Sequence, residues 1–518
     1  MKAGYGRSIL TPPMGLELAG YGYYLERRAT SVNDDLYARC VWLEAGEDGD
    51  EKLDEFVQAG NAGRVYEAEK ADEAEKINEA EKVNEAGKVN EAGKTVKTKE
   101  TDEAEKVKTN KTNEIALIIS CDVLGLSRTV CDAFYALLQE EMGIGSKQVL
   151  LVSVHTHTAP TVKHHEGTGE VDPVYTAMLP EKLMEAVRAA AADVKQVKEI
   201  VFSSRQMQGD FFYNRAQENG PVDTNLRGFL IAREEGEDIA LLSAACHCVF
   251  RGRVSAVSAD LSGAVCLSAS RKNVLPVYIN GLCGDIDPYL PSPERLDACA
   301  DEISSLIGKC RESMNGRVLR QTLSCGRIAH TLKLTSVTLD DIHKAADEAQ
   351  RRASTGIPGS GRVARVWERE MEAKFDTLTD TEDLTVGYVV LGGIPILALP
   401  FEGFTEIGLR IRGVLASGQG ACAESSDAEI NEHCMVNNVL LQPENFSILN
   451  GGSSIAKDAI ILGCAEELLG YLPTKADIDK GAYAALESTF LYKRLPVVTG
   501  EAERLGDALG HAMVEILR

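Results

Sequence analysis

The sequence predicts an α/β fold: a single large catalytic domain with a central mixed sheet flanked by helices, interrupted by a low-complexity loop insertion. Short apolar runs alternate with amphipathic segments along most of the chain, which is the pattern of strands and helices in turn. Several runs, such as VLLVSV, are apolar almost throughout, as expected of strands covered on both faces. With 518 residues, of which 44% are hydrophobic, the chain can bury a large core.

The elements are expected in the following order. The predicted strands are 36–46, 114–122, 148–154, 198–208, 238–249 and 274–280, then an edge strand within 320–340 and a hairpin over 386–400. The predicted helices are 126–143, 173–194 and 262–272, two more before the hairpin, and 501–518. The hairpin turns at Gly392 and Gly393, which supply the positive φ that tight turns need. Spacing places Leu505, Leu509 and Met513 on one face of the last helix, together with Leu517.

One segment departs from this alternation. From residue 67 to 94 the chain repeats every six residues, as in EAEKAD EAEKIN EAEKVN. At about 100° per residue the repeated alanines circle a helix axis and form no apolar stripe, so the segment has no face to bury. We interpret 61–113 as an insertion that lengthens a loop between two strands. The predicted organisation is therefore a catalytic domain over 1–518 with the Glu/Lys/Ala/Asn repeat insertion at 61–113 inside it.

Composition narrows the class of partner. The formal net charge of −24 argues against nucleic acid and anionic membrane surfaces, since both attract basic faces. No apolar run is long enough to form a transmembrane segment, and MKAGYGRSILTPPMG lacks the apolar region of a secretory signal. The scattered cysteines include no CxxC pair, which favours reduced thiols. We therefore expect a cytoplasmic protein, and the sequence leaves its oligomeric state unknown.

Polar side chains gather where apolar runs end. The groups that follow such runs are His155 and His157, His247, Asp285 and Asp287, and Glu402. Ligands of open α/β sheets bind beyond the carboxyl ends of strands. His155 and His157, two positions apart in extended chain, should point to the same side. Imidazole and carboxylate together suit zinc.

Each of these signals is weak when taken alone. A single histidine at a strand end is more often a hydrogen-bonded structural residue, and GDIDP also reads as a turn followed by a helix. Only the joint placement favours a metal site. His164 and His165, in the Gly-rich stretch VKHHEGTGE, have two interpretations: they line the site entrance, or they belong to a solvated loop, and we favour the loop. His343 has no convergent carboxylate in sequence and receives no functional weight.

A resemblance to a known family rests on motifs in a fixed order. The motifs are ILTPPMGLELAGYG, VHTHTAP, YNRAQENG, CHCV with SADLSG, NGLCGDIDP, LPFEGFTEIGLRIR and GCAEELLGYLPTKADI. They resemble corresponding segments of the neutral, non-lysosomal ceramidases, which are zinc-dependent amidases. The resemblance covers roughly 5–50 and 115–515.

The resemblance implies roles for individual residues. The implied zinc ligands are His155, His247, Glu402 and Tyr471. His157 matches the histidine that contacts the substrate carbonyl and its developing oxyanion, and Arg215 matches an arginine of the same site. Asp285 matches the aspartate of the family's Asp-x-Ser block.

The sequence also departs from the family pattern. Asp287 stands where the family has a catalytic serine, and an ionised carboxylate accepts a proton but does not donate one. The ceramidases are secreted and carry a C-terminal β-sandwich domain, whereas we expect this chain to be a divergent, bacterial-type homologue without that domain. These departures leave the substrate open among small-molecule and lipid amides.

Three functions follow as hypotheses. In the first, bound zinc activates water for hydrolysis of an amide, His157 and Arg215 stabilise the oxyanion, and Asp287 or Asp285 accepts the proton. In the second, the same scaffold cleaves an ester or phosphoester, with a second metal at Asp285 and Asp287. In the third, the chain is a metal-binding homologue that has no hydrolytic activity.

Overall fold

The computed structural model describes residues 1–46, 114–312, 316–353, 356–417 and 458–518. All the described helices and strands belong to one unit, formed by Met1–Ala45 together with Glu114–Arg518. The insertion predicted at 61–113 lies outside the described residues. The domain organisation expected from the sequence therefore stays a prediction.

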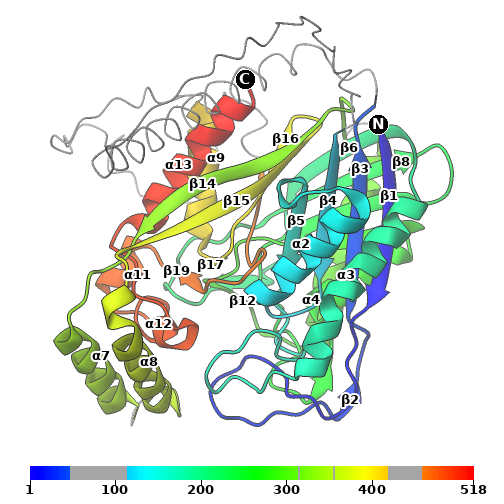
Figure 1. Cartoon of the computed structure of the whole chain (residues 1–518). Helices are drawn as coiled ribbons and strands as arrows, with labels where there is room; N and C mark the ends of the chain where they lie inside the picture. The colour runs from blue at the N-terminus through cyan, green and yellow to red at the C-terminus, as the bar shows by residue number, and fades with distance from the viewer. Residues whose placement is uncertain (47–113, 313–315, 354–355, 418–457) are drawn as a thin grey trace, which may run out of the picture. The chain divides into compact units, whose positions relative to one another are not determined.

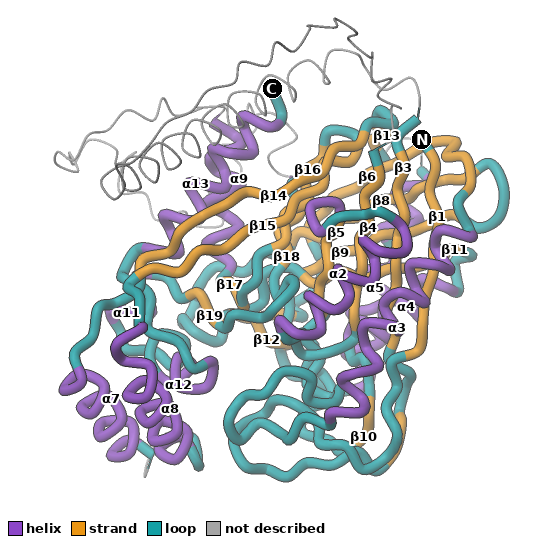
Figure 2. The backbone as a smooth tube through the Cα atoms, viewed as in Figure 1, coloured by secondary structure: helices purple, strands orange, loops and turns teal. Residues whose placement is uncertain are grey.

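The larger of two main sheets is nine-stranded and mixed (Figure 2). Its strands are β1 (Lys2–Ile9), β3 (Tyr37–Glu44), β4 (Ile115–Cys121), β5 (Val149–Ser153), β6 (Lys195–Gln206), β8 (Asn225–Arg233), β9 (Asp238–Ala244), β11 (Val274–Asn280) and β13 (Arg317–Leu319). Their order is β11-β9-β8-β6-β1-β3-β4-β5, with β13 beside β6. The β4–β5 and β9–β11 pairs are parallel, and the others are antiparallel. A mixed central sheet is thus confirmed.

The sheet curls until its two end strands meet. β5 and β11 stand at opposite ends of the strand order, yet Asn280 donates to the carbonyl oxygen of Val154 at 3.0 Å. The Ser120 hydroxyl likewise donates to the Tyr278 carbonyl oxygen at 2.6 Å. Because of this curl, the segments that follow β5 and β11 leave the sheet next to each other.

A smaller sheet of four strands packs against the first. Its strands, in spatial order, are β14 (Leu323–Lys333), β15 (Thr381–Leu391), β16 (Ile394–Ala398) and β18 (Ile460–Leu462). Val389 and Ile396 of this sheet share a buried apolar cluster with Ile118 and Val152 of the larger one. The predicted edge strand and hairpin are confirmed here, with φ of 60° at Gly392 and 85° at Gly393.

Helices cover both layers (Figure 1). They are α2 (Arg128–Met142), α3 (Pro173–Ala192), α4 (Leu261–Ser270), α5 (Pro293–Ser304), α6 (Leu306–Arg311), α7 (Leu339–Arg352), α8 (Ser360–Lys374), α9 (Thr405–Ser417), α11 (Lys475–Asp479), α12 (Glu487–Tyr492) and α13 (Glu501–Ile516), with short 3-10 turns at Ser146–Gln148 and Phe375–Thr377. α2 and α3 lie over β1, β3 and β4, while α9 and α13 lie beside the smaller sheet. Leu505, Leu509 and Met513 of α13 are buried, as their spacing predicts.

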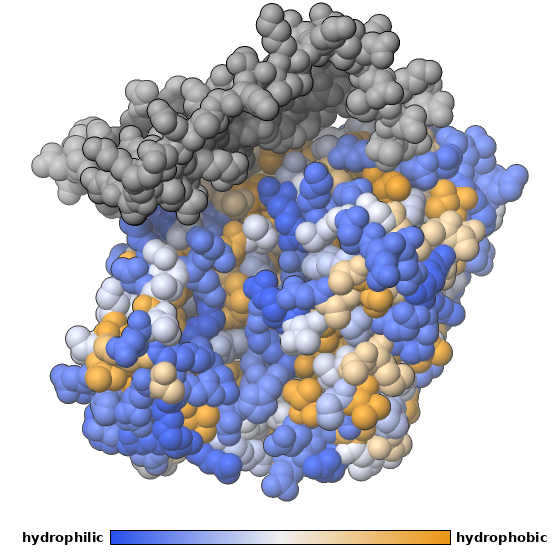
Figure 3. Space-filling model, in the orientation of Figure 1, coloured by the Kyte–Doolittle hydropathy of each residue, from blue (hydrophilic) through white to orange (hydrophobic). Residues whose placement is uncertain are grey.

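Short strand pairs connect the loops. They are β2 (Ser31–Val32) with β10 (Ala256–Val257), β7 (Phe212–Asn214) with β12 (Ile286–Pro288), and β17 (Glu402–Gly403) with β19 (Tyr471–Leu472). Across the described ranges, no helix combines the length and the apolar character needed to cross a bilayer. In the view of Figure 3, apolar side chains are scattered among hydrophilic ones.

A buried ion cluster ties the larger sheet to α9. Asp223 accepts from Arg227 of β8 at 2.9 Å and lies 2.9 Å from the guanidinium of Arg412 on α9. Burial alone would raise the pKa of Asp223, but the two guanidinium groups lower it below its usual range. Because a depressed carboxyl pKa stabilises the fold only above the unfolded value, this contribution is lost as the pH falls through the acid range.

We expect Asp223→Asn to destabilise the protein by about 3 kcal/mol at neutral pH, because it leaves two buried arginines without their carboxylate. Urea unfolding measures the difference, which should shrink below about pH 4, where the unfolded carboxyl protonates. Asp507→Asn is the matched control, since its pair with Arg410 on α9 is exposed and worth less than about 1 kcal/mol. Equal losses in both variants would contradict this account.

Candidate metal centre

His155 lies just beyond β5, at a point where the chain turns out of the sheet. Its φ of 64° is left-handed, and its N–H donates to the Val123 carbonyl oxygen at 3.0 Å. Its ring Nδ1 lies 2.8 Å from the carbonyl oxygen of Leu124. The sequence prediction that the HxH stretch is extended is therefore wrong, because backbone bonds to the 123–124 loop impose a turn at the first histidine.

The same turn still brings the imidazoles together. Thr156 forms a parallel bridge with Cys248, which places the segment after β5 beside the segment after β9. The ring centroid of His155 lies 5.0 Å from that of His157 and 4.9 Å from that of His247. The predicted meeting of three histidines is thus present, although tertiary pairing and not strand alternation produces it.

The GDIDP loop holds His247 in place. Its backbone N–H donates to the carbonyl oxygen of Ile286 at 3.0 Å, and its ring Nδ1 lies 3.0 Å from the same oxygen. A ring whose Nδ1–H bonds a carbonyl presents the Nε2 lone pair in the opposite direction. His155 is anchored in the same way, through Leu124. Both imidazoles therefore direct Nε2 away from these carbonyls, and His247 Nε2 lies 3.3 Å from the Arg215 guanidinium.

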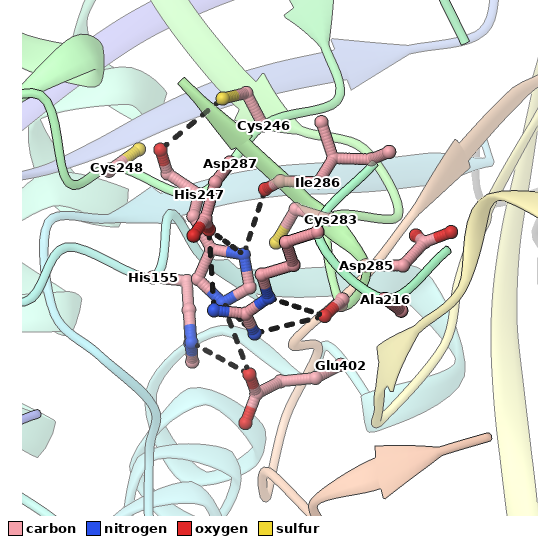
Figure 4. A network of polar contacts seen from close by, with 12 residues as sticks. His155, Ala216, Cys246, His247, Cys248, Cys283, Asp285, Ile286, Asp287 and Glu402 are labelled. Atoms are coloured by element: carbon pink, nitrogen blue, oxygen red, sulfur yellow. Dashed lines mark hydrogen bonds and ion pairs between the residues drawn. The ribbon is translucent and has the colours of Figure 1, made fainter. Parts of the chain in front are cut away.

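Glu402 reaches these rings from the strand pair β17–β19. Its Oε2 lies 3.1 Å from His155 Nε2 and 3.3 Å from His247 Nε2 (Figure 4). The GDIDP loop lies close behind, since a Cβ at Gly284 would stand only 2.3 Å from the Glu402 carbonyl oxygen. Glycine at position 284 is therefore needed to let the two segments approach.

These donors fit a metal ion. Bonds of about 2.0–2.1 Å to a tetrahedral zinc put neighbouring ligand atoms about 3.3 Å apart, which is close to the observed separations from Glu402. Ligand atoms of His155, His157 and His247 all lie within 4.8 Å of one another. Both buried ring nitrogens of His157 have no hydrogen-bond partner among the described residues. The chain therefore contains a candidate metal-binding group of imidazoles beside a carboxylate.

The electrostatics of the group follow from burial and pairing. Burial alone would lower the pKa of His155, but the Glu402 carboxylate raises it to about 9. Burial would raise the pKa of Glu402, but His155 and His247 hold it well below its usual range. Burial and the two neighbouring imidazoles lower the pKa of His157 well below its usual range. Glu402 is therefore ionised, and His157 is neutral.

Tyr471 lies next to Glu402, because the two residues are register partners of β19 and β17. Its hydroxyl accepts a hydrogen bond from Arg215 at 2.8 Å. The Arg215 guanidinium also donates to the Gly284 carbonyl oxygen at 3.0 Å and lies 3.3 Å from Asp287 Oδ1. Arg215 therefore connects three parts of the predicted site, with 31% of its side chain exposed.

The two aspartates of GDIDP have different settings. Asp285 is buried, and its carboxylate accepts from Asn214 at 2.8 Å and from the Thr405 N–H and hydroxyl at 2.9 and 3.0 Å. Burial raises the pKa of Asp285 to about 6, although these bonds oppose the rise. Asp287 faces Arg215, and 23% of its side chain is exposed. Asp285 thus holds neighbouring segments, whereas the Asp287 side chain is partly exposed, with its Oδ1 buried.

A small cavity of about 70 Å³ opens beside the imidazoles. Its lining residues are Gly20, Tyr21, Gly22, Tyr23, Leu124, His155, His157, His165, Thr168, Glu402, Tyr471, Tyr483, Leu491 and Tyr492. The Tyr492 hydroxyl donates to Glu402, so this tyrosine supports a predicted ligand. The sequence prediction that His165 belongs to a solvated loop is wrong, because that side chain is buried against Tyr492. No local signal distinguishes Tyr492 in the sequence.

A second group, on α7 and α8, is exposed. His343 lies 3.0 Å from Glu372 and 3.8 Å from Glu368. Arg365 already bonds both oxygens of Glu368, at 2.9 and 3.1 Å. This group therefore serves best as a control for the buried one.

We expect the buried group to bind one divalent ion, and His247→Ala to weaken its affinity by about 100-fold or more, since losing even an outer partner of a ligand costs about 10- to 100-fold. Titration of the metal-stripped protein with Zn²⁺ measures this. His343→Ala should leave the tight site unchanged. Unchanged affinity in His247→Ala would contradict the assignment.

Comparison with known proteins supports the fold. No family model matches the sequence, and no curated protein matches it. The solved neutral ceramidase from Pseudomonas aeruginosa is similar with a TM-score of 0.60 at 10% identity, over 99% of this chain and 74% of that one. A ceramidase complexed with C2 is similar with a TM-score of 0.62 at 11% identity, over 100% and 75%. The resemblance seen in the motifs is confirmed in three dimensions: the chain has the fold of the neutral ceramidases.

Proposed function

We propose that the chain is a zinc-dependent hydrolase that cleaves an amide bond. The observation that carries the proposal is the meeting of His155, His247 and Glu402, with both imidazoles anchored through Nδ1. His155 and Glu402 also line a cavity. Tyr471 would complete the ligand set beside Glu402. The two similar structures are described as ceramidases, which supports a small-molecule or lipid amide as substrate.

A bound zinc ion would supply part of the chemistry of amide hydrolysis, and side chains around it would supply the rest. Zinc in such a site supplies a Lewis acid that polarises a carbonyl oxygen and lowers the pKa of water to about 7. His157, neutral and without a partner among the described residues, lines the cavity and can donate to an oxyanion. Arg215 does not line the cavity, but it orients Tyr471, which does, and adds positive charge behind it.

Asp287 is the proposed proton acceptor. Its carboxylate is partly exposed and lies 3.3 Å from Arg215 and 3.6 Å from His247 Nδ1. The oxygens of Asp285, in contrast, already accept from Asn214 and Thr405. In this proposal Asp287, which is not among the residues that line the cavity, holds the proton during acyl transfer and returns it to the leaving amine. Asp285 acts on the reaction only by positioning.

The ester or phosphoester hypothesis with two metals has less support. It needs Asp285 and Asp287 as ligands, yet the first already accepts three hydrogen bonds from Asn214 and Thr405 and the second faces a guanidinium. An assay of hydrolytic activity distinguishes the non-catalytic hypothesis from the proposed amide hydrolysis. Zinc-loaded protein that cleaves neither N-acyl amines nor matched esters would support it.

The cytoplasmic location expected from the sequence stays a prediction.

We expect the zinc-loaded protein to hydrolyse N-acyl amines, and His157→Ala to lower kcat by about 10²- to 10³-fold through loss of an oxyanion donor. Release of the free amine measures the rate. His164→Ala, at an exposed neighbouring position, should keep the wild-type rate and bound zinc. Wild-type activity in His157→Ala would exclude this role.

For Asp287→Asn we expect kcat to fall by about 10²- to 10⁴-fold with zinc content unchanged, because an amide cannot accept the proton. Asp287→Ser should recover part of the loss, since a hydroxyl both donates and accepts. Steady-state kinetics and metal analysis measure both variants. Full activity in Asp287→Asn would show that another group accepts the proton.

A further inference from the structure

The His157 imidazole has no hydrogen bond that fixes its direction, since neither ring nitrogen has a partner in the described parts of the chain. Its ring lies edge-on to that of Tyr21, with the centroids 5.0 Å apart. The backbone of Gly20 lies against it, because a Cβ there would stand 2.4 Å from His157 Nδ1. An oxyanion donor stabilises charge only when its N–H is held in place beforehand. The direction of His157 therefore depends on how Gly20, Tyr21 and its own backbone are fixed.

The Arg27 guanidinium contacts each of these parts. Its Nη2 donates to the carbonyl oxygens of Ala19 and His157, at 2.5 Å each. The Ala19 carbonyl belongs to the peptide that leads into Gly20. The guanidinium carbon also lies over the Tyr21 ring, 4.9 Å from its centroid. Gly20, Tyr21 and His157 line the cavity, whereas Arg27 does not, so one cation ties these three residues together from behind the wall.

Arg27 is a buried cation that bonds to carbonyl oxygens. The residue is 8% exposed, and its Nη1 donates to the Val254 carbonyl oxygen at 2.6 Å. Burial, with the nearby Arg253 guanidinium, lowers the pKa of Arg27 to about 10, so the group is charged at neutral pH. A buried charge is costly unless polar groups compensate it. The planar fork of a guanidinium holds several acceptors at fixed angles, and here those acceptors belong to the backbone of the site.

The residues on either side of His157 have anchors of their own. The hydroxyls of Thr156 and Thr158 donate to the Ser258 carbonyl oxygen, at 2.9 and 2.8 Å. The candidate metal ligands are held through their Nδ1 atoms, as described above. Loss of the Arg27 guanidinium therefore leaves the motif and the ligands in place, and it frees the carbonyl of His157 alone within the motif.

Arg28 provides a matched comparison beside Arg27. Its guanidinium donates to the Gly15 carbonyl oxygen at 3.0 Å and pairs with Glu17 at 2.6 Å. Its side chain is 58% exposed, and both of these partners belong to the N-terminal segment. Arg28 thus shares the residue type and a carbonyl contact with Arg27, without the bond to His157.

We propose that Arg27 is a positioning residue that holds the His157 imidazole at the angle needed to donate to an oxyanion. The inference deepens the proposed amide hydrolysis and rests on it for the role of His157. Arg27 does not touch the substrate and acts through the backbone of His157 and of the Ala19–Gly20 peptide. Its loss lets the imidazole adopt more than one direction while metal binding continues.

The kinetic test uses the zinc-loaded full chain and N-acyl amine substrates. We expect Arg27→Ala to lower kcat by about 10- to 100-fold with KM nearly unchanged, since a misplaced catalytic group costs up to about 10²-fold. Arg27→Lys should recover part of the loss, because an ammonium also donates to carbonyl oxygens. Guanidinium chloride, far below denaturing concentrations, should raise the rate of Arg27→Ala, whereas urea should not. Arg28→Ala should behave as wild type.

A second measurement observes the imidazole without any substrate. Long-range ¹H–¹⁵N correlation spectra of histidine-labelled, zinc-loaded protein report each ring, and comparison with His157→Ala assigns the signals of His157. We expect one sharp set of these signals in the wild type and in Arg28→Ala. In Arg27→Ala they should shift or broaden, while the signals of His155 and His247 keep their positions. Zinc affinity should be equal in the wild type and in the arginine variants.

The outcomes separate this inference from the proposed function. A wild-type rate or unchanged His157 signals in Arg27→Ala overturns the positioning role and leaves hydrolysis standing. Loss of zinc binding in both Arg27→Ala and Arg27→Lys also overturns it, because Arg27 would then support the fold as a whole. His157 signals that change in Arg27→Ala but not in Arg28→Ala, in a wild type that cleaves no amide, support the positioning role and overturn amide hydrolysis.

Discussion

The site depends on one buried contact, in which the Glu402 carboxylate meets the imidazoles of His155 and His247 at 3.1 and 3.3 Å. An ionised carboxylate without exposure to water is costly unless opposite charge or a metal compensates it. Its partners come from the segments after β5 and β9, whereas the carboxylate follows the smaller sheet. Burial of any one of the three therefore requires that both sheets are assembled.

Close backbone approach makes this assembly possible. A Cβ at Gly20 would lie 2.4 Å from His157 Nδ1, and one at Gly284 would lie 2.3 Å from the Glu402 carbonyl oxygen. Residues 462–465 pass between the ends of the larger sheet, with bridges from Leu462 to Gly281 and from Ala465 to Val152. The imidazoles thus sit in a frame whose spacing is set by backbone contacts. Such a frame suits a metal site, because fixed neighbours orient the ligand side chains.

Local pattern is sufficient to predict most of the strands and helices. The apolar run at the start of Val274–Asn280 predicts a strand, and this segment is β11. Two glycines between apolar runs predict the hairpin, and it forms there. His155, His247 and Glu402 were grouped because each follows such a run. The resemblance adds Tyr471 to this group. Tyr471 pairs with Glu402 through a two-residue strand, which is too short to show a hydrophobic period in the sequence.

The amino-acid sequence by itself determined the strands, the helices and the types of side chain at their ends, since hydrophobic period and turn chemistry are local. Only the tertiary structure decided the curl that joins β5 to β11, the left-handed turn at His155 and the burial of His165. Each of these depends on hydrogen bonds between segments distant in the chain. His165 shows the difference most clearly: its neighbours in sequence are polar and glycine-rich, but the loop is bonded down onto residues 17–24, and that docking turns one of two adjacent histidines into the cavity.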